Sequence, residues 1–497
     1  MPRLLLWLGF GGWLAGGPVL PTSASTNSAP DWVWTLNVTG ARGHAVARDA
    51  SGNVYITGGF GGTVAFGTTN LTAQSRSELF VAKVAPSGQF VWVAQARGSG
   101  DAYVIAKDIA LDSIGNIYVG GGLSDEVDFG PTNLNSGYFT WSDAFLAKYD
   151  SAGRCQWAWQ GNSRDDPWAY CSAVAVDSND DVIISGHYKP GIFCSGEASG
   201  CLLNNWHDAF VAKFNGAGEV QWYGGLGGGT WNEANALAID EANNVFMTGY
   251  FSRESSFGSS RGVSDLYVAK YDSGGELKWV RQAGAVSDGN DDDDSYDEGL
   301  GVVVDQLGAV YVTGSFAGGE VTFGETNLMG GTQDFFLAKY DSTGGLEWVR
   351  KGYGWLGTSI AIDGAGDVYT TVSPPFIHKY DAAGNLLWTK DAGPGQGFTD
   401  AAIAVAPDGS KYVTTDYVFL RKLDTAGTGP RLSIATSAES VTLSWQLAAM
   451  GYQPQVANDL AAPDWRPVSA TDGTNGVFRT LTVPRTNQNQ FYRLQKN

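Results

Sequence analysis

Residues 143–157 read DAFLAKYDSAGRCQW, and residues 208–222 read DAFVAKFNGAGEVQW. Related stretches recur seven times along the 497-residue chain, beginning at 78, 143, 208, 265, 334, 375 and 418. A second element, such as ALDSIGNIYVGG at 110–121, precedes each of them. Since self-similarity at a regular spacing is the mark of repeat architectures, we expect seven copies of one structural unit.

Each unit is predicted to be a four-stranded antiparallel meander. Its β-branched and aromatic runs favour strands, and the Asp, Ser, Gly and Asn clusters between them favour tight turns. We name the strands A to D in chain order, so that ALD ends strand A, IYVGG is strand B, AFLAKY is strand C and CQWAW is strand D. An element with FG and a polar loop follows strand B in four units, at Phe66, Phe129, Phe257 and Phe323.

The two ends of the chain predict that the array closes on itself. Strand D carries a tryptophan in six units: Trp92, Trp157, Trp222, Trp279, Trp348 and Trp388. The seventh unit has no strand D, whereas DWVWTLN at 31–37 supplies Trp34 ahead of the first unit. Because an isolated sheet with two apolar faces must be covered, we predict a closed seven-bladed β-propeller whose N-terminal strand completes the last blade.

The repeat also resembles a known family. The series DxxGNVYVTG, then FG, then DxFVAKYDxxGxxxW is similar to the bacterial seven-bladed β-propeller repeat (SBBP) and covers about 31–428. The resemblance implies an exported propeller and says little about activity. After 428 the repeat stops, and alternating strands at 431–497 predict a small β-sandwich-like C-terminal module.

Composition and the N-terminus bear on the compartment and the partners. A formal net charge of −20 argues against nucleic acid as a ligand. Residues 1–24 have the features of a signal peptide: Arg3, an apolar run too short to span a bilayer, and a small-residue cleavage motif at 22–24. We therefore expect a protein secreted or held at the surface or in the periplasm of a bacterium, with no membrane span after cleavage.

Export makes the four cysteines candidates for disulfides. Cys194 with Cys201 could close one loop, and Cys155 with Cys171 would then join neighbouring units. Four cysteines allow three pairings, and buried free thiols are the alternative.

Two repeated charges are interpreted as structural. Strand C carries a lysine in every unit: Lys83, Lys148, Lys213, Lys270, Lys339, Lys379 and Lys422. Strand A ends in an aspartate in six units: Asp49, Asp112, Asp177, Asp240, Asp305 and Asp363. The meander brings both toward one end of the sheet, so we expect ion pairs within blades. The four histidines, at 44, 187, 207 and 378, lie at scattered positions and show no metal or triad pattern.

Aromatic residues gather in the loops that join D to A and B to C, which emerge on one face of a propeller, the loop face. The candidate ligand-binding residues are Tyr103, Trp141, Trp168, Trp206, Trp231 and Trp355. Tyr296 and Phe398 occupy the same D–A position in other units. Aromatic rings beside carboxylates suit sugars, whereas a regularly repeated ring could instead pack between blades. Trp141 and Trp206 break the repeat and are expected to be exposed.

An acidic loop before the fifth unit is a candidate Ca²⁺ site. Positions 1, 3, 5 and 9 of a calcium-loop pattern hold Asn290, Asp292, Asp294 and Glu298. Ser295 replaces the usual turn glycine, so the alternative is a solvated acidic loop without a specific metal.

These features together predict an exported, non-enzymatic binding or interaction platform that engages glycans or cell-surface partners through its loop face. The alternative is an extracellular carbohydrate-active enzyme, a glycosidase or lyase, that uses carboxylates on the same face.

Overall fold

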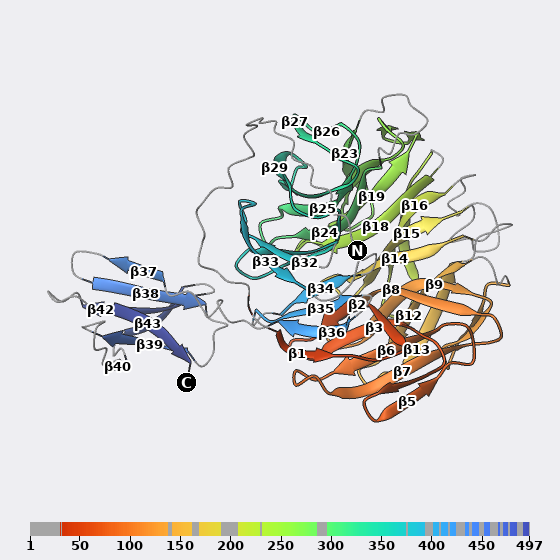
Figure 1. The fold of residues 1–497 in the computed structure, drawn as a ribbon, viewed down its shortest axis with the longest axis horizontal. Helices are drawn as coiled ribbons and strands as arrows, with labels where there is room; N and C mark the ends of the chain where they lie inside the picture. The colour runs from red at the N-terminus through yellow and green to blue at the C-terminus, as the bar shows by residue number, and fades with distance from the viewer. Residues whose placement is uncertain are drawn as a thin grey trace, which may run out of the picture.

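The computed structural model is built from strands (Figure 1). It describes residues 30, 32–137, 142–161, 168–189, 207–228, 231–285, 296–373, 376–392, 401–406, 409–415, 418–423, 433–436, 440–446, 452–457, 466–467, 471–475, 478–484 and 491–496. Among these residues, no helix has the length and apolar character needed to cross a membrane.

The propeller has seven blades, each a four-stranded antiparallel sheet with strands A to D in order. Blade 1 is β2 (Ala41–Arg48), β3 (Val54–Phe60), β6 (Glu78–Val84) and β7 (Phe90–Gly98). Blade 2 is β8 (Tyr103–Leu111), β9 (Ile117–Ser124), β12 (Asp143–Tyr149) and β13 (Cys155–Gly161). Blade 3 is β14 (Tyr170–Val176), β15 (Val182–Tyr188), β16 (Asp208–Phe214) and β17 (Val220–Leu226). Blade 4 is β18 (Trp231–Ile239), β19 (Val245–Ser252), β22 (Asp265–Tyr271) and β23 (Leu277–Ala285).

The remaining three blades continue the same order. Blade 5 is β24 (Glu298–Val304), β25 (Val310–Phe316), β28 (Asp334–Tyr340) and β29 (Leu346–Lys351). Blade 6 is β30 (Leu356–Ile362), β31 (Val368–Ser373), β32 (Phe376–Tyr380) and β33 (Leu386–Asp391). Blade 7 is β34 (Ala402–Val405), β35 (Lys411–Thr415), β36 (Val418–Leu423) and, from the other end of the chain, β1 (Trp32–Leu36).

The predicted closure is confirmed. Strand β1 pairs antiparallel with β36 and places Trp34 opposite Lys422. In blade 1 the strand-D residue Trp92 faces Lys83 in the same way. The N-terminal strand and the last strand of the repeat therefore lie side by side (Figure 1). The array has no free strand edge at its junction, which is how a closed β architecture avoids edge-to-edge association.

The strand-D tryptophans join neighbouring blades. The indole Nε1 of Trp92 donates a hydrogen bond to the carbonyl oxygen of Ser151 in the C–D turn of the next blade, at 3.2 Å. Gly153 in that turn has a φ of +80°, and a Cβ there would stand 2.7 Å from the Trp92 ring. Trp34 makes the equivalent bond to Pro86 at 3.1 Å. Tryptophan and the turn glycine thus recur together because each fits against the other.

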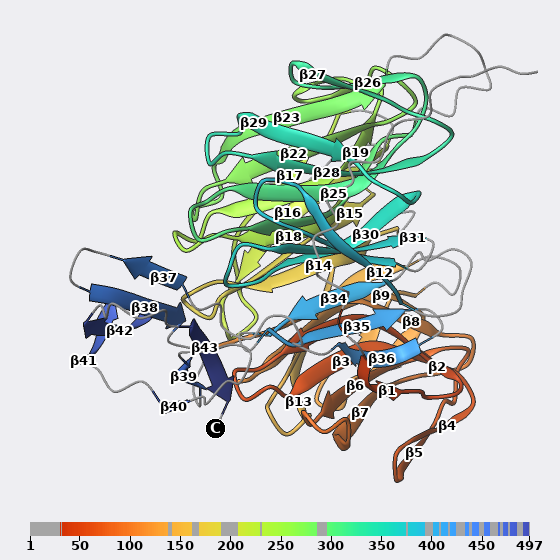
Figure 2. The same cartoon turned by 60° about the vertical axis from the view of Figure 1, so that its left-hand side comes forward.

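The FG elements form two-stranded hairpins rather than loops. They are β4–β5 (Thr63–Phe66 and Thr69–Thr72), β10–β11 (Glu126–Asp128 and Asn133–Asn135), β20–β21 (Glu254–Ser255 and Gly258–Ser259) and β26–β27 (Glu320–Phe323 and Thr326–Met329). Strand β10 pairs with β7 of the preceding blade, and β26 pairs with β23. Figure 2 shows β26–β27 and β4–β5 at the outer edge of the propeller. The hairpins β10–β11 and β26–β27 therefore extend the preceding sheet outward, whereas β4–β5 and β20–β21 form separate two-stranded sheets.

The hydrophobic core lies between adjacent blades. Strand-B aromatics such as Tyr55, Tyr118 and Tyr311 are fully buried. The phenylalanine of the FG element packs on an aromatic ring of strand C, with ring centroids 5.0 Å apart for Phe66 and Phe80. Each blade thus covers the apolar face of its neighbour, as the repeat predicts.

The C-terminal residues form two small antiparallel sheets. One contains β37 (Ser433–Thr436), β38 (Ser440–Gln446), β42 (Phe478–Pro484) and β41 (Thr471–Asn475). The other contains β40 (Arg466–Pro467), β39 (Tyr452–Ala457) and β43 (Phe491–Lys496). The described residues of this region are strands, and the β-sandwich-like module at 431–497 stays a prediction. The proposed boundary at 429–430 and the signal peptide at 1–24 lie outside the described residues, so both stay predictions.

Of the alternatives open for Cys155 and Cys171, the structure has free thiols rather than a disulfide between them. Cys155 begins β13, the outer strand of blade 2, whereas Cys171 lies on β14, the inner strand of blade 3. Strands at opposite radial edges of adjacent blades cannot bring two Cα atoms within disulfide distance. Cys194 and Cys201 lie outside the described residues.

Candidate functional site

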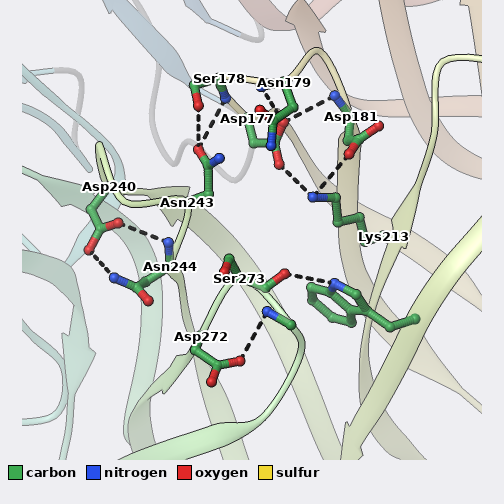
Figure 3. Close-up of polar contacts among 12 residues, drawn as sticks. Asp177, Ser178, Asn179, Asp181, Lys213, Asp240, Asn243, Asn244, Asp272 and Ser273 are labelled. Atoms are coloured by element: carbon green, nitrogen blue, oxygen red, sulfur yellow. Dashed lines mark hydrogen bonds and ion pairs between the residues drawn. The ribbon is translucent and has the colours of Figure 1, made fainter.

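The repeated aspartates and lysines are structural, with variations between blades. Lys213 lies 2.7 Å from Asp177 and 3.0 Å from Asp181 (Figure 3). The predicted ion pair also forms between Lys83 and Asp49, at 3.6 Å. A third pair, Lys270 with Asp240, is longer, at 3.9 Å. In other blades the lysine turns to a different partner, such as Glu347 for Lys339 or Asp367 for Lys379.

The strand-A aspartate stabilises the A–B turn that follows it. Asp240 Oδ1 accepts hydrogen bonds from the backbone N–H groups of Ala242 and Asn244, and its Oδ2 accepts from the Asn244 side chain (Figure 3). Such side-chain-to-backbone bonds explain why Asp recurs before the A–B turn in six of the seven units. These contacts lie on the face opposite the loop face.

A second carboxylate, at the start of strand C, fixes the B–C loops of the loop face. Asp265 Oδ1 accepts from the backbone N–H groups of Arg261 and Gly262, at 2.9 and 3.3 Å. Its Oδ2 accepts from Gln282 Nε2 at 2.6 Å. The acidic residue of the DAFLAKY element therefore supports loop geometry, a role that the sequence pattern alone did not reveal.

The inner strands of all seven blades line a central channel with a volume of about 580 Å³. In six blades strand A carries a β-bulge at the same position. The bulged residues are His44, Lys107, Ser172, Asn235, Leu300 and Thr358, and all but one are polar. A bulge re-aims the side chain of its extra residue, and these side chains all line the channel.

Some bulge side chains tie one inner strand to the next. His44 Nδ1 donates to the carbonyl oxygen of Ala106 at 2.8 Å. Asn235 Nδ2 donates to Gly299 at 3.0 Å. Some polar groups in the middle of the channel thus join neighbouring blades. The end of the channel at the loop face is therefore the better candidate for a binding site.

Blades 3 and 4 depart from the repeat at that end. The position before the strand-C acid is Ser77, Ser142 and Ser264 in three blades and Gln333 in blade 5, but it is His207 in blade 3. The sixth residue of strand B is small in the other described blades, whereas it is His187 in blade 3 and Tyr250 in blade 4. Positions shared by all blades serve the common scaffold, so the exceptions are the better candidates for function.

These exceptions and the side chains around them form one group, the channel-mouth cluster. Its members are Trp168, Tyr170, His187, His207, Trp231, Glu233, Tyr250 and Glu298. The rings of His207 and Trp231 are stacked, with centroids 3.9 Å apart and planes at 14°. Trp168 meets both rings edge-on. Two of the four histidines, His187 and His207, are therefore brought together, because strands B and C of one blade lie beside strand A of the next.

Glu233 is the polar centre of the cluster. Trp231 Nε1 donates to its Oε1 at 2.6 Å, and its Oε2 lies 3.7 Å from His187 Nδ1. Both ring nitrogens of His187 lack a hydrogen-bond partner among the described residues, although the side chain is buried. Buried polar groups are nearly always paired, so an unpaired imidazole beside a cavity calls for an explanation.

Burial sets the protonation of this region. It lowers the pKa of His187, and the nearby Glu233 opposes that effect only in part, so the imidazole is neutral at neutral pH. Burial, reinforced by the charge of Glu233, raises the pKa of Glu298 to about 7. Two carboxylates at the mouth thus occupy different environments.

The predicted ligand-binding aromatics divide into two groups. Tyr103, Trp168 and Trp231 are half-buried, and all three pack against neighbouring residues, as the packing alternative predicts. Trp355 is 56% exposed, and Tyr296 and Tyr353 are 51% and 71% exposed. Trp141, Trp206 and Phe398 lie outside the described residues. The repeat pattern did not predict Tyr353, because this residue lies two positions before the repeated aromatic and the pattern has no aromatic residue there.

The proposed Ca²⁺ site falls largely outside the described residues, which exclude Asn290, Asp292 and Asp294. Glu298 begins β24 and belongs to the channel-mouth cluster. Its neighbour Asp297 is fully buried and accepts backbone N–H bonds from Ala285 and Ala317. Within the part of the chain that the structure describes, no group of three or more His, Cys, Asp or Glu is arranged to hold a metal.

Comparison with known proteins finds a WD repeat-containing relative and propeller structures of low similarity. No family model matches the chain. An uncharacterized WD repeat-containing protein of Acanthamoeba polyphaga mimivirus is 25% identical over 370 residues, which cover 60% of this chain and 26% of that protein. The chain thus spans about a quarter of the length of this curated relative.

Solved structures that resemble the chain are propellers of low identity. The WD40 β-propeller domain of Doa1 is 10% identical, with a TM-score of 0.44, and the match covers 78% of this chain and 95% of that one. A catalytically inactive virginiamycin B lyase from Staphylococcus aureus, solved with quinupristin, is 8% identical, with a TM-score of 0.40 and coverage of 78% and 97%. Both TM-scores are below 0.5, so these likenesses carry no argument about this chain, and the resemblance to the SBBP family stays a prediction.

Proposed function

We propose that this propeller is a non-enzymatic interaction platform that acts outside the cytoplasm and binds glycans, free or on a cell surface, through its loop face. The exposed aromatic patch, defined as Tyr296, Tyr353 and Trp355, is the observation that carries the proposal. Large exposed aromatics on adjacent blades are costly in water unless they meet a partner. The patch lies at the D–A loops of blades 5 and 6, which open on the same face as the channel.

The patch is held in place by its backbone. Trp355 N–H donates to the carbonyl oxygen of Ser373 at 2.7 Å, and Gly354 before it has a φ of +122°. Tyr353 packs against Phe376, with ring centroids 5.7 Å apart. Tyr296 forms a parallel bridge with Ser264 of the preceding blade. A rigid ring loses little conformational entropy on binding, which favours recognition of a flexible polymer such as a glycan.

The chemistry of the face suits sugars more than nucleic acids. An aromatic ring offers an apolar surface for the C–H groups of a pyranose, and carboxylates such as Glu233 accept hydrogen bonds from hydroxyls. The net charge of −20 disfavours polyanionic ligands.

A second candidate function is a carbohydrate-active enzyme. It is favoured by the contrast between Glu233, which accepts a hydrogen bond from Trp231, and Glu298, whose pKa burial raises to about 7. Pairs of acids in different environments are typical of general acid–base sites. Incubation of a bound glycan followed by product analysis separates the two: intact glycan supports the platform, and shortened or unsaturated products support the enzyme.

A glycan array tests the proposal. We expect the parent to retain one class of glycan, and Trp355→Ala with Tyr353→Ala to weaken retention by at least about tenfold, the loss expected when central aromatic contacts are removed. Leu307→Ala is the matched control, because Leu307 is 91% exposed in the A–B turn on the opposite face. Equal retention by the parent and the double variant, or no retention of any glycan, contradicts the proposal.

A further inference from the structure

The channel offers a second surface, which opens on the same face of the propeller as the aromatic patch. Tyr170, His187 and Glu233 all line the cavity where it reaches the loop face. The volume of about 580 Å³ lies within the roughly 300–1,000 Å³ range of small-molecule sites. The side chain of Glu233 is 19% exposed, so one edge of the carboxylate can be reached from the cavity.

Glu233 is prearranged as an acceptor. The Trp231 indole fixes one carboxylate oxygen at 2.6 Å, and the Tyr267 hydroxyl donates to the Glu233 backbone carbonyl at 3.0 Å. A carboxylate has about four lone-pair sites, so a held Glu233 still has capacity for donors from a ligand. Neutral His187 beside it can accept one hydrogen bond and donate another. Tyr250 also donates a hydrogen bond to the Glu233 side chain, and a ligand with adjacent hydroxyl groups can donate to the lone pairs that remain.

The charges on the channel wall select among such ligands. The carboxylates are Glu233 and Asp108, and Asp108 accepts backbone N–H bonds from Ile109 and Val174. The cationic or titratable bases on the wall are Lys107, His44 and the neutral His187. With the whole chain at −20, an added carboxylate or sulfate on the ligand is repelled, whereas an uncharged polyol is not.

We propose that the channel mouth is a subsite for the terminal residue of a neutral glycan, whose hydroxyls bind Glu233 while its ring lies against Tyr170. This inference rests on the proposed function and adds to it the part of the ligand that is recognised and its charge. The polymer beyond the terminal residue then extends over the aromatic patch. The channel mouth thus binds the end of the glycan chain. Only the aromatic patch contacts the internal sugar residues of that chain.

Monosaccharides are the probes that test the subsite, because they fit the channel and leave the patch largely uncovered. Saturation-transfer NMR with the full chain compares glucose, galactose, mannose and N-acetylglucosamine with glucuronate and galacturonate. We expect at least one neutral sugar to bind and neither uronate to bind. Glu233→Gln should weaken the neutral sugar by about tenfold, as expected when a hydrogen bond to a charged acceptor is lost.

Two controls make the result specific. Glu254→Gln makes the same substitution in blade 4 on the exposed hairpin β20–β21, and it should leave binding unchanged. Trp355→Ala should weaken the polymer on the array but not the monosaccharide. If Glu233→Gln lowers the melting temperature, Tyr170→Leu removes the ring instead and should also weaken the sugar.

Three outcomes overturn the subsite. They are no binding of any neutral monosaccharide, binding of uronates as strong as that of neutral sugars, or parent-like affinity in both Glu233→Gln and Tyr170→Leu. If a glycan is retained on the array and one of these outcomes is also found, the proposed interaction platform is supported and the subsite is refuted. Failure of both assays removes the proposed function as well.

Discussion

Trp34→Ala tests whether the N-terminal strand is a full member of blade 7. The Trp34 ring packs on Gly88 and near Tyr412, and its indole bonds to Pro86. A half-buried tryptophan removes roughly 100 Å² of surface from water, worth about 2.5 kcal/mol. The partly exposed hydrogen bond adds about 0.5 kcal/mol. We therefore expect the free energy of unfolding to fall by about 3 kcal/mol.

The assay is urea unfolding followed by far-UV circular dichroism, which does not depend on the tryptophan that is removed. Trp92→Ala makes the same change in blade 1 and should cost a similar amount, because both tryptophans hold the next blade's C–D turn. Thr35→Ala on the same strand changes an exposed side chain and should stay within about 0.5 kcal/mol of the parent. If Trp34→Ala behaves like Thr35→Ala while Trp92→Ala is costly, the closure argument is refuted.

Three further predictions concern charge, metal and domain organisation. Burial raises the pKa of Asp297 to about 7. Its folded state therefore holds a proton more tightly than the unfolded state, and stability is lost as pH rises toward 7. In the parent, ionisation of Asp297 should lower the free energy of unfolding by about 2 to 3 kcal/mol between pH 5 and 8. Asp297→Asn should lack this decrease, and an unchanged pH dependence in the variant would count against the buried acid. If the acidic loop binds Ca²⁺, millimolar Ca²⁺ should raise the melting temperature of the parent but not of Asp292→Asn with Asp294→Asn, and a parent that does not respond rules the site out. Truncation after Pro430 should leave the melting transition of the propeller intact, and its loss would show that the C-terminal module is part of the same folding unit.

The fold was predictable from the sequence because each repeated residue stabilises a strand, a turn or a contact between blades. The displaced Trp34 predicted closure, since strand D is absent after the seventh unit and a single strand stands before the first. The hairpins at the FG elements were not foreseen. Their pairing with the preceding blade, as between β10 and β7, depends on tertiary position rather than on local pattern.

The site was less predictable than the fold. His187 and His207 meet only because a B–C connection returns the chain to the same end of the blade, and no short motif marks that contact. A signal was nevertheless present: His207 replaces a serine found at three equivalent positions. The bulges that place His44 and Asn235 in the channel have no sequence mark of their own. The exposure of Trp355 and the packing of Trp231 could not be separated, because both occupy the same loop of the repeat.

Hydrogen–deuterium exchange with and without the array-selected glycan tests the central claim most directly. We expect slower exchange at 352–358, which carries most of the aromatic patch, and at 231–239, which carries Glu233. We expect no change in the A–B turn at 305–309 on the opposite face. Protection confined to that turn, or exchange that is unchanged throughout the loop face while the glycan is bound, would contradict glycan binding at the loop face.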